Sequence, residues 1–141
     1  MPTSRISIMR YFIYTWILLL QLIICNDSVA ADITQHQLLD SLDSKGEPLI
    51  LDVRRPDEYA AGHVPHAINI PHTELEGRLE QLHANANDEI VVYCESGRRA
   101  AIAEDILTQA GFTKVLHLQG DMKAWRLHGL PMQENNFSNT H

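Results

Sequence analysis

Apolar residues occur along the chain in short runs that alternate with amphipathic stretches. Mostly apolar runs predict four short buried strands, over residues 49–51, 67–70, 89–93 and 114–118. Apolar positions at helical spacing predict helices over residues 34–42, 73–83, 100–110 and 121–128, with one helical turn over 56–59. Strands that alternate with helices are typical of parallel pairing, so we expect an α/β domain with three layers. Its central, mostly parallel sheet would have about five short strands with helices on both faces.

Polar residues and glycine mark the ends of these helices. Thr34 with Gln37, and Thr73 with Glu76, have the spacing of a capping box, in which both side chains pair with backbone amides at a helix start. Two helices are therefore predicted to begin at these threonines. Gly62 follows the helical turn and predicts a left-handed cap there.

The first thirty residues have the pattern of an export signal. Arg5 and Arg10 precede an apolar run over residues 11–24, which as a helix would be shorter than the roughly 30 Å hydrocarbon core of a membrane. A small-x-small pattern ending at Ala30 then predicts cleavage, although cleavage after Ala31 fits almost as well. We therefore expect a cleaved signal peptide and a periplasmic protein. Retention of the uncleaved signal as a membrane anchor is the alternative.

Cleavage would divide the chain into three parts. Residues 1–30 would be the signal peptide, residues 31–132 the folded domain, and residues 133–141 a polar C-terminal tail. No stable membrane insertion is expected after cleavage. A lipoprotein, with Cys25 as the lipidated residue, is disfavoured because Ile24 before it is not small.

Composition and charge restrict the class of protein. The 141 residues, of which 45% are hydrophobic and 21% charged, fit one globular domain rather than a disordered or disulfide-rich chain. The net charge of -7 argues against general nucleic-acid binding, which requires a basic face. Signal cleavage would remove one of the two cysteines, Cys25. Cys94 would then have no partner for a disulfide within the exported domain.

Cys94 begins a segment, residues 94–99, that can make a thiol reactive and that we call the cysteine loop. It lies between a predicted strand and a predicted helix, whose N-terminal amides and dipole favour a bound anion. Arg98 and Arg99 add two positive charges, and Gly97 allows successive amides to curl around an anion. These features favour the thiolate, which is the nucleophilic form of cysteine. The alternative is that Cys94 is a small core residue at the end of a strand.

Three segments carry the motifs of a known family. The first runs from Leu51-Asp52-Val53-Arg54 through Pro56-x-Glu58-Tyr59-x-x-Gly62-His63 to Pro71. The second is Cys94-x-x-Gly97-x-Arg99, and the third is Val115-x-x-Leu118-x-Gly120 with Ala124-Trp125. Over residues 33–131 the sequence therefore resembles the rhodanese family. Within that family it is most similar in type to the small exported members that consist of a single domain.

The resemblance implies a rhodanese-like fold and a thiosulfate sulfurtransferase. The Cys94 thiolate would attack the outer sulfur of thiosulfate, release sulfite and hold a persulfide until a thiophilic acceptor removes the sulfur. The acceptor would be cyanide, a thiol or a reduced thioredoxin-like protein, and the domain is expected to be a monomer. Asp52 and Arg54 would support the loop rather than react. The substrate would be bound by the residues that follow the cysteine: Glu95, Ser96, Gly97, Arg98 and Arg99.

Two residues depart from the family's pattern. His66 stands where the family often has glycine, and Asp121 replaces the second glycine expected after Gly120. Both lie outside the cysteine loop. We therefore expect them to affect local turn geometry and the partner surface more than the chemistry.

Other functions are compatible with parts of this sequence. A non-enzymatic persulfide carrier or a stress-related binding module would also keep Cys94. A cysteine phosphatase is disfavoured because its loop needs five residues between cysteine and arginine, whereas four precede Arg99 here. His63, His66 and His72 lie close in sequence but match no zinc pattern, so we expect neither a metal nor a cofactor.

Overall fold

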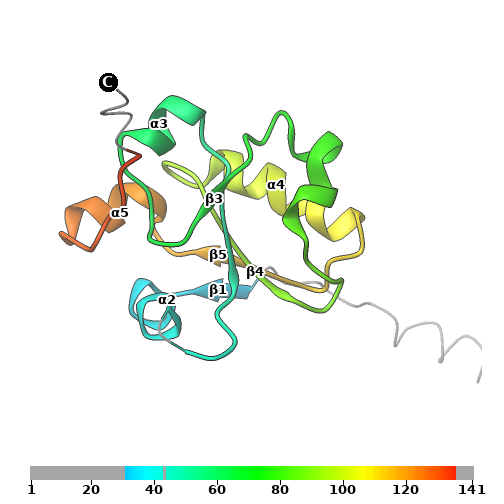
Figure 1. Ribbon diagram of the computed structural model, residues 1–141, viewed down its shortest axis with the longest axis horizontal. Helices are drawn as coiled ribbons and strands as arrows, with labels where there is room; N and C mark the ends of the chain where they lie inside the picture. Colours follow the sequence, from blue (N-terminus) through cyan, green and yellow to red (C-terminus); the bar gives the residue numbers. More distant parts are fainter. Residues whose placement is uncertain (1–30, 43, 136–141) are drawn as a thin grey trace, which may run out of the picture.

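The structure, a computed structural model, describes residues 31–42 and 44–135. Its centre is a five-stranded sheet (Figure 1) made of β1 (Ala31–Ile33), β2 (Leu49–Asp52), β3 (Ile68–Asn69), β4 (Glu89–Tyr93) and β5 (Lys114–Leu118). The strands lie in the order β1-β5-β4-β2-β3, and each neighbouring pair is parallel. The predicted α/β domain with a parallel sheet of about five short strands is confirmed.

Helices cover both faces of the sheet (Figure 1). On one face lie α4 (Arg98–Gln109) and the 3-10 helix η1 (Leu75–Leu82). On the other face lie α2 (Gln35–Ser41) and α5 (Asp121–Leu127). The short helix α3 (Pro56–Ala60) follows β2. The protein therefore has the three layers that the alternation of strands and helices predicts.

Buried side chains alternate between the two faces along β2 and β4. Leu51, Ile90 and Val92 belong to the core under α4 and η1, whereas Ile50 and Val91 belong to the core under α2 and α5. All five are at most 1% exposed. Because both faces are covered, these strands are apolar at successive positions rather than at every second one.

The capping predictions are confirmed at one helix and wrong at another. The Thr34 side chain accepts a hydrogen bond from the Gln37 amide, and the Gln37 side chain accepts one from the Thr34 amide. The capping box predicted at Thr73 is wrong, because η1 has Glu74 at its N-cap without a side-chain hydrogen bond. Thr73 lies instead inside a turn that the Glu74 amide closes on the carbonyl of Pro71.

The strand β1 is not predicted by the sequence pattern. Its three residues pair with β5, and of them only Ile33 is buried. A segment of three residues is too short to show a periodic pattern. Its conformation depends instead on pairing with the neighbouring strand. Gly62, predicted as a left-handed cap, has a φ of +148°, which is positive but not that of a left-handed helix.

Backbone contacts continue past residue 132, where the folded domain was expected to end. Gln133 forms an antiparallel bridge with His63, and the Asn135 amide donates to the carbonyl of Ala60. The predicted signal peptide lies outside the described residues, as do residues 136–141 of the predicted tail. Among the helices of the described part of the chain, none is both long and apolar enough to cross a membrane.

Candidate active site

Cys94 directly follows β4, which lies between β5 and β2 in the sheet. The cysteine loop connects β4 to α4 at the carboxyl end of the strands, where ligands of parallel α/β sheets bind. Cys94 is 1% exposed and packs with the core under α4. Its sulfur accepts a hydrogen bond from the amide of Gly97 at 3.1 Å. This hydrogen bond, rather than burial, distinguishes Cys94 from an ordinary core cysteine.

Gly97 gives the loop its turn. Its φ is +96°, a conformation that other residues rarely adopt. It is the N-cap of α4, and the Ala101 amide donates to its carbonyl at 3.0 Å. The amides of residues 98–100, in the first turn of the helix, have no acceptor within it. The loop therefore places several backbone donors and the positive end of the helix dipole beside Cys94.

Arg99 is held beside the sulfur by Glu58 of α3. Its two terminal nitrogens donate to the two carboxylate oxygens of Glu58 at 2.7 and 3.0 Å. Glu58 raises the pKa of Arg99, and the Cys94 sulfur contributes in the same direction. In turn, Arg99 lowers the pKa of Glu58 to about 2. The guanidinium is therefore a positioned positive charge at neutral pH.

The remaining loop residues lie nearer the surface. Ser96 and Arg98 are exposed. The carboxylate of Glu95 is paired with Arg126 and also lies 3.7 Å from a nitrogen of Arg54. These two arginines offset the negative charge that Glu95 brings to the loop.

Asp52 and Arg54 form a buried ion pair next to the cysteine loop. Arg54 donates through Nε and Nη2 to the two carboxylate oxygens of Asp52, at 3.0 and 2.7 Å. Nη2 also donates to the carbonyl of Gly62 at 2.8 Å. The pair thus links the end of β2 to the turn after α3, and its contact with Glu95 extends this support to the loop.

Asp121 and His117 contact the loop although sequence reasoning did not select them. One carboxylate oxygen of Asp121 accepts a hydrogen bond from the Cys94 amide at 2.9 Å. The other lies 3.1 Å from Nε2 of His117, whose Nδ1 pairs with Glu104. Asp121 therefore contacts the backbone of Cys94 in addition to shaping a turn. The one sequence signal was its departure from the expected glycine.

The two departures from the family pattern share an unusual backbone conformation. Asp121 and His66 have φ values of +52° and +66°. Glycine adopts such values without strain, which is consistent with the glycines that the family pattern leads one to expect at these positions. Here each side chain finds a partner, since His66 Nδ1 lies 2.5 Å from a carboxylate oxygen of Glu47.

Two of the three histidines considered as metal ligands, His63 and His66, have other side-chain partners. His63 stacks on Tyr59 with ring centroids 3.7 Å apart, and its Nδ1 lies 2.9 Å from the Tyr59 carbonyl oxygen. Over residues 31–42 and 44–135, no three His, Cys, Asp or Glu side chains are grouped so that they could hold a metal ion.

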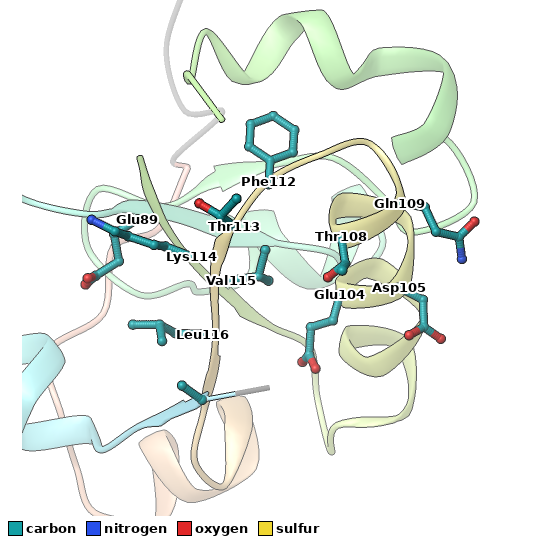
Figure 2. A pocket seen from close by; sticks show the side chains of 11 residues that line it. Glu89, Glu104, Asp105, Thr108, Gln109, Phe112, Thr113, Lys114, Val115 and Leu116 are labelled. Carbon is teal, nitrogen blue, oxygen red and sulfur yellow. The ribbon is translucent and has the colours of Figure 1, made fainter. Parts of the chain in front are cut away.

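A surface cavity of about 460 Å³ lies apart from the cysteine loop. Figure 2 shows its lining side chains, most of which come from the second half of α4, from β5 and from the turn between them, with Glu89 of β4 and Ala31 of β1 added. Glu104, Asp105 and Lys114 supply its charged groups together with Glu89. None of the lining residues belongs to the cysteine loop, so the candidate site is the loop itself rather than this cavity.

The loop suits a nucleophilic sulfur that carries negative charge. The Gly97 amide contacts the sulfur, and Arg99 is fixed close by. Backbone donors and a guanidinium together stabilise an anionic sulfur and an oxyanion beside it.

Comparisons with known proteins agree with these motifs. The family profile described as Rhodanese-like domain matches residues 34–128, more than half of the chain. A sulfurtransferase of Allochromatium vinosum is 34% identical over 101 residues, which cover 72% of this chain and 92% of the relative. Thiosulfate sulfurtransferase PspE of Escherichia coli (strain K12) is 40% identical over 70 residues, which cover 50% of this chain and 67% of PspE.

Other relatives are longer than this chain. YrkF of Bacillus subtilis (strain 168), whose name describes a sulfur carrier, is 37% identical over 100 residues. The match covers 71% of this chain and 53% of YrkF, and the chain likewise spans about half the length of other curated relatives. Among solved structures, a thiosulfate sulfurtransferase from Pseudomonas aeruginosa is 28% identical with a TM-score of 0.69. That match covers 74% of this chain and 20% of the other.

Proposed function

The chain belongs to the rhodanese-like family, and we propose that it is a thiosulfate sulfurtransferase in which Cys94 carries the transferred sulfur. Because relatives of this chain are named sulfurtransferases, the class of reaction is sulfur transfer. Thiosulfate as the donor is supported by the names of PspE and of the Pseudomonas aeruginosa protein.

In the first half-reaction, the Cys94 thiolate attacks the outer sulfur of thiosulfate. The S–S bond of thiosulfate breaks, its electron pair leaves with sulfite, and a new S–S bond joins the outer sulfur to Cys94. Charge is conserved, because the persulfide and sulfite together carry the same negative charge as the thiolate and thiosulfate. Arg99, which Glu58 holds beside the sulfur, would bind the sulfonate oxygens while this bond breaks.

In the second half-reaction, a thiophilic acceptor attacks the terminal sulfur of the persulfide. With cyanide, a carbon–sulfur bond forms, the persulfide S–S bond breaks, and thiocyanate leaves while the Cys94 thiolate is regenerated. A thiol acceptor, free or on a reduced thioredoxin-like protein, would take the sulfur in the same way. One cysteine is sufficient for both halves of the reaction.

The hydrogen bond from the Gly97 amide to the Cys94 sulfur is the observation that carries this proposal. At 3.1 Å it supplies a donor to a sulfur that must be negatively charged to react. Among the described residues no acceptor outside the helix pairs with the amides of residues 98–100, so they can donate to the terminal sulfur of a persulfide, which is also an anion.

Steady-state turnover tests the proposal. The full chain is incubated with thiosulfate and cyanide while sulfite and thiocyanate are both measured. We expect the two products to form in equal amounts, and we expect Cys94→Ser to form neither. Cys25→Ser is the matched control, because it makes the same change at the other cysteine of the chain and should keep full activity. Absence of sulfite release from the unaltered chain would exclude thiosulfate as the donor.

A persulfide carrier is the second candidate, and the name of YrkF favours it. A carrier would receive sulfur from the persulfide of another protein and would turn over poorly with thiosulfate. It would give little sulfite in the steady-state assay. Cys94 would nevertheless gain sulfur when the chain is mixed with a protein that already bears a persulfide.

We propose in addition that the chain is exported and that the domain acts in the periplasm. The charged and apolar pattern of residues 1–30 supports this location. Cleavage after Ala30 would leave β1 whole, whereas cleavage after Ala31 would remove the residue that pairs with Leu116. N-terminal sequencing of the periplasmic protein should find Ala31 first. A chain that keeps Met1 and fractionates with membranes would contradict the proposal.

A further inference from the structure

Three charged side chains form a connected row behind the cysteine loop. Glu104 comes from α4, His117 from β5, and Asp121 from the first position of α5. Nδ1 of His117 pairs with Glu104, and Nε2 lies 3.1 Å from the Asp121 carboxylate. The second oxygen of that carboxylate accepts the Cys94 amide at 2.9 Å. The row therefore ends on the backbone of the residue that bears the sulfur.

The geometry favours an imidazolium at His117. A neutral imidazole has one N–H, whereas both ring nitrogens of His117 face a carboxylate, an arrangement in which the doubly protonated ring donates to both. In agreement, the hydrogen bonds with Asp121 and then Glu104 raise the pKa of His117 to about 10. His117 is therefore positively charged at neutral pH.

Asp121 occupies a position that is costly for an aspartate. It is 4% exposed, and its φ of +52° is one that a residue with a side chain adopts with strain. A carboxylate beside Cys94 also disfavours the thiolate, because like charges repel. The hydrogen bond to the Cys94 amide and the charge of His117 are the interactions that offset these costs.

The pair also contacts the part of the loop that binds the sulfur. A side chain added at Gly97 would meet Oδ2 of Asp121 at 3.1 Å and Nε2 of His117 at 3.6 Å. Gly97 is the residue whose amide donates to the Cys94 sulfur. Asp121 therefore lies against both ends of the turn that forms the sulfur site, and His117 lies against its Gly97 end.

We propose that Asp121 and His117 are positioning residues for the cysteine loop. Asp121 fixes the Cys94 amide, and His117 neutralises the Asp121 carboxylate so that it does not oppose the negative charge on the sulfur. This inference rests on the proposed function only in taking Cys94 as the reacting group. It assigns a role to a residue that replaces the second glycine of the family pattern.

The other charged groups that face Cys94 are already paired with one another. Arg99 of α4 is bound by Glu58 of α3. Glu95 contacts Arg54 and Arg126. Substitutions at Asp121 or His117 leave these pairs in place, so their effects on the sulfur can be separated.

The test measures how readily the Cys94 thiolate forms, without any sulfur donor. In a Cys25→Ser chain, Cys94 is the one thiol of the sequence. The ultraviolet absorbance of its thiolate is followed against pH, after subtraction of the absorbance of a chain that carries both Cys25→Ser and Cys94→Ser. We expect His117→Gln to move the midpoint of this titration upward by about one pH unit, because it leaves Asp121 uncompensated. In the double variant Asp121→Asn with His117→Gln, the midpoint should return to within about 0.3 unit of the parent.

The double variant separates charge from packing. If it stays displaced as far as His117→Gln, or if His117→Gln does not move the midpoint, the proposal is wrong. His66→Gln is the matched control, because it removes a histidine paired with one carboxylate, Glu47, and should not move the midpoint. Far-ultraviolet circular dichroism checks folding of each variant, and His117→Asn replaces His117→Gln if the latter does not fold. The titration needs no thiosulfate, so its outcome is independent of whether thiosulfate is the donor.

Discussion

The amide of Gly97 lies 3.1 Å from the sulfur of Cys94 and donates a hydrogen bond to it. The contact depends on a glycine with a φ of +96° between the sheet and α4. On one side of it Arg99 is fixed by Glu58, and on the other Asp121 holds the Cys94 amide. We therefore expect the reactivity of Cys94 to depend on the conformation of the turn that contains Gly97.

Replacement of Gly97 by alanine should damage this turn. The new Cβ would lie 3.1 Å from Oδ2 of Asp121, in a backbone conformation that costs an alanine roughly 1 kcal/mol. We expect thiosulfate turnover to fall about tenfold or more, because the amide donor to the sulfur is displaced. Gly46→Ala is the control, since Gly46 has a φ of +114° and open space around it. Gly46→Ala should lose stability but keep turnover, and equal losses of turnover would argue against a specific role for Gly97.

Arg99→Ala should lower kcat/KM for thiosulfate by about a hundredfold, because the sulfonate loses its fixed cation. Arg55→Ala should change it by about twofold at most, since Arg55 is exposed and its charge is screened. Arg55 is a close control because it also approaches Glu58, at 3.6 Å. Initial rates at varied thiosulfate concentration give both values.

A double variant distinguishes loss of the arginine from exposure of its partner. Arg99→Ala leaves Glu58 unpaired, and that negative charge would itself repel thiosulfate. Adding Glu58→Gln removes the repulsion. The double variant should stay strongly impaired if Arg99 binds the substrate, whereas recovery close to full activity would mean that Arg99 serves only to neutralise Glu58.

His117 should make the stability of the domain fall at alkaline pH. Its pKa is raised from 6.5 to about 10 in the folded chain by Asp121 and Glu104. The folded state thus binds the proton more tightly than the unfolded state. This contribution is fully present below pH 6.5 and is lost as the pH rises through about 10. We expect the loss to be about 2 kcal/mol, less than the full shift implies because His117 is partly exposed.

Urea unfolding at several pH values measures this dependence. The free energy of unfolding of the parent should decline through the alkaline range, and the decline should be shallower in His117→Gln. His66→Gln should keep the slope of the parent. If the free energy of unfolding of His117→Gln declines as steeply with pH as that of the parent, a group other than His117 causes the decline.

Local patterns in the sequence predicted most of the architecture. The apolar runs of β2, β4 and β5 reflect burial on both faces, and the capping box at Thr34 depends on residues three positions apart. β1 and the 3-10 form of η1 could not be predicted in this way. The first pairs with β5, a strand distant in sequence, and the second begins only after a turn that the Glu74 amide closes on the Pro71 carbonyl.

The cysteine loop was predictable because its parts are adjacent in sequence. Cys94, Gly97 and Arg99 lie within six residues, so the spacing alone indicates an anion-binding turn. The contacts that orient the loop join distant residues. Glu58 and Arg99 are 41 positions apart, and Cys94 and Asp121 are 27 apart. Only the fold brings these groups together.

The most direct test of Cys94 as the sulfur carrier is the mass of the protein after exposure to thiosulfate alone. Without an acceptor, the first half-reaction should stop at the persulfide, with a gain of about 32 Da on Cys94 and release of one sulfite for each sulfur gained. Peptide mapping should locate the added sulfur at Cys94, and treatment with cyanide should remove it. A chain that gains no sulfur, or a Cys94→Ser chain that gains as much as the parent, would contradict the assignment of Cys94 as the sulfur carrier.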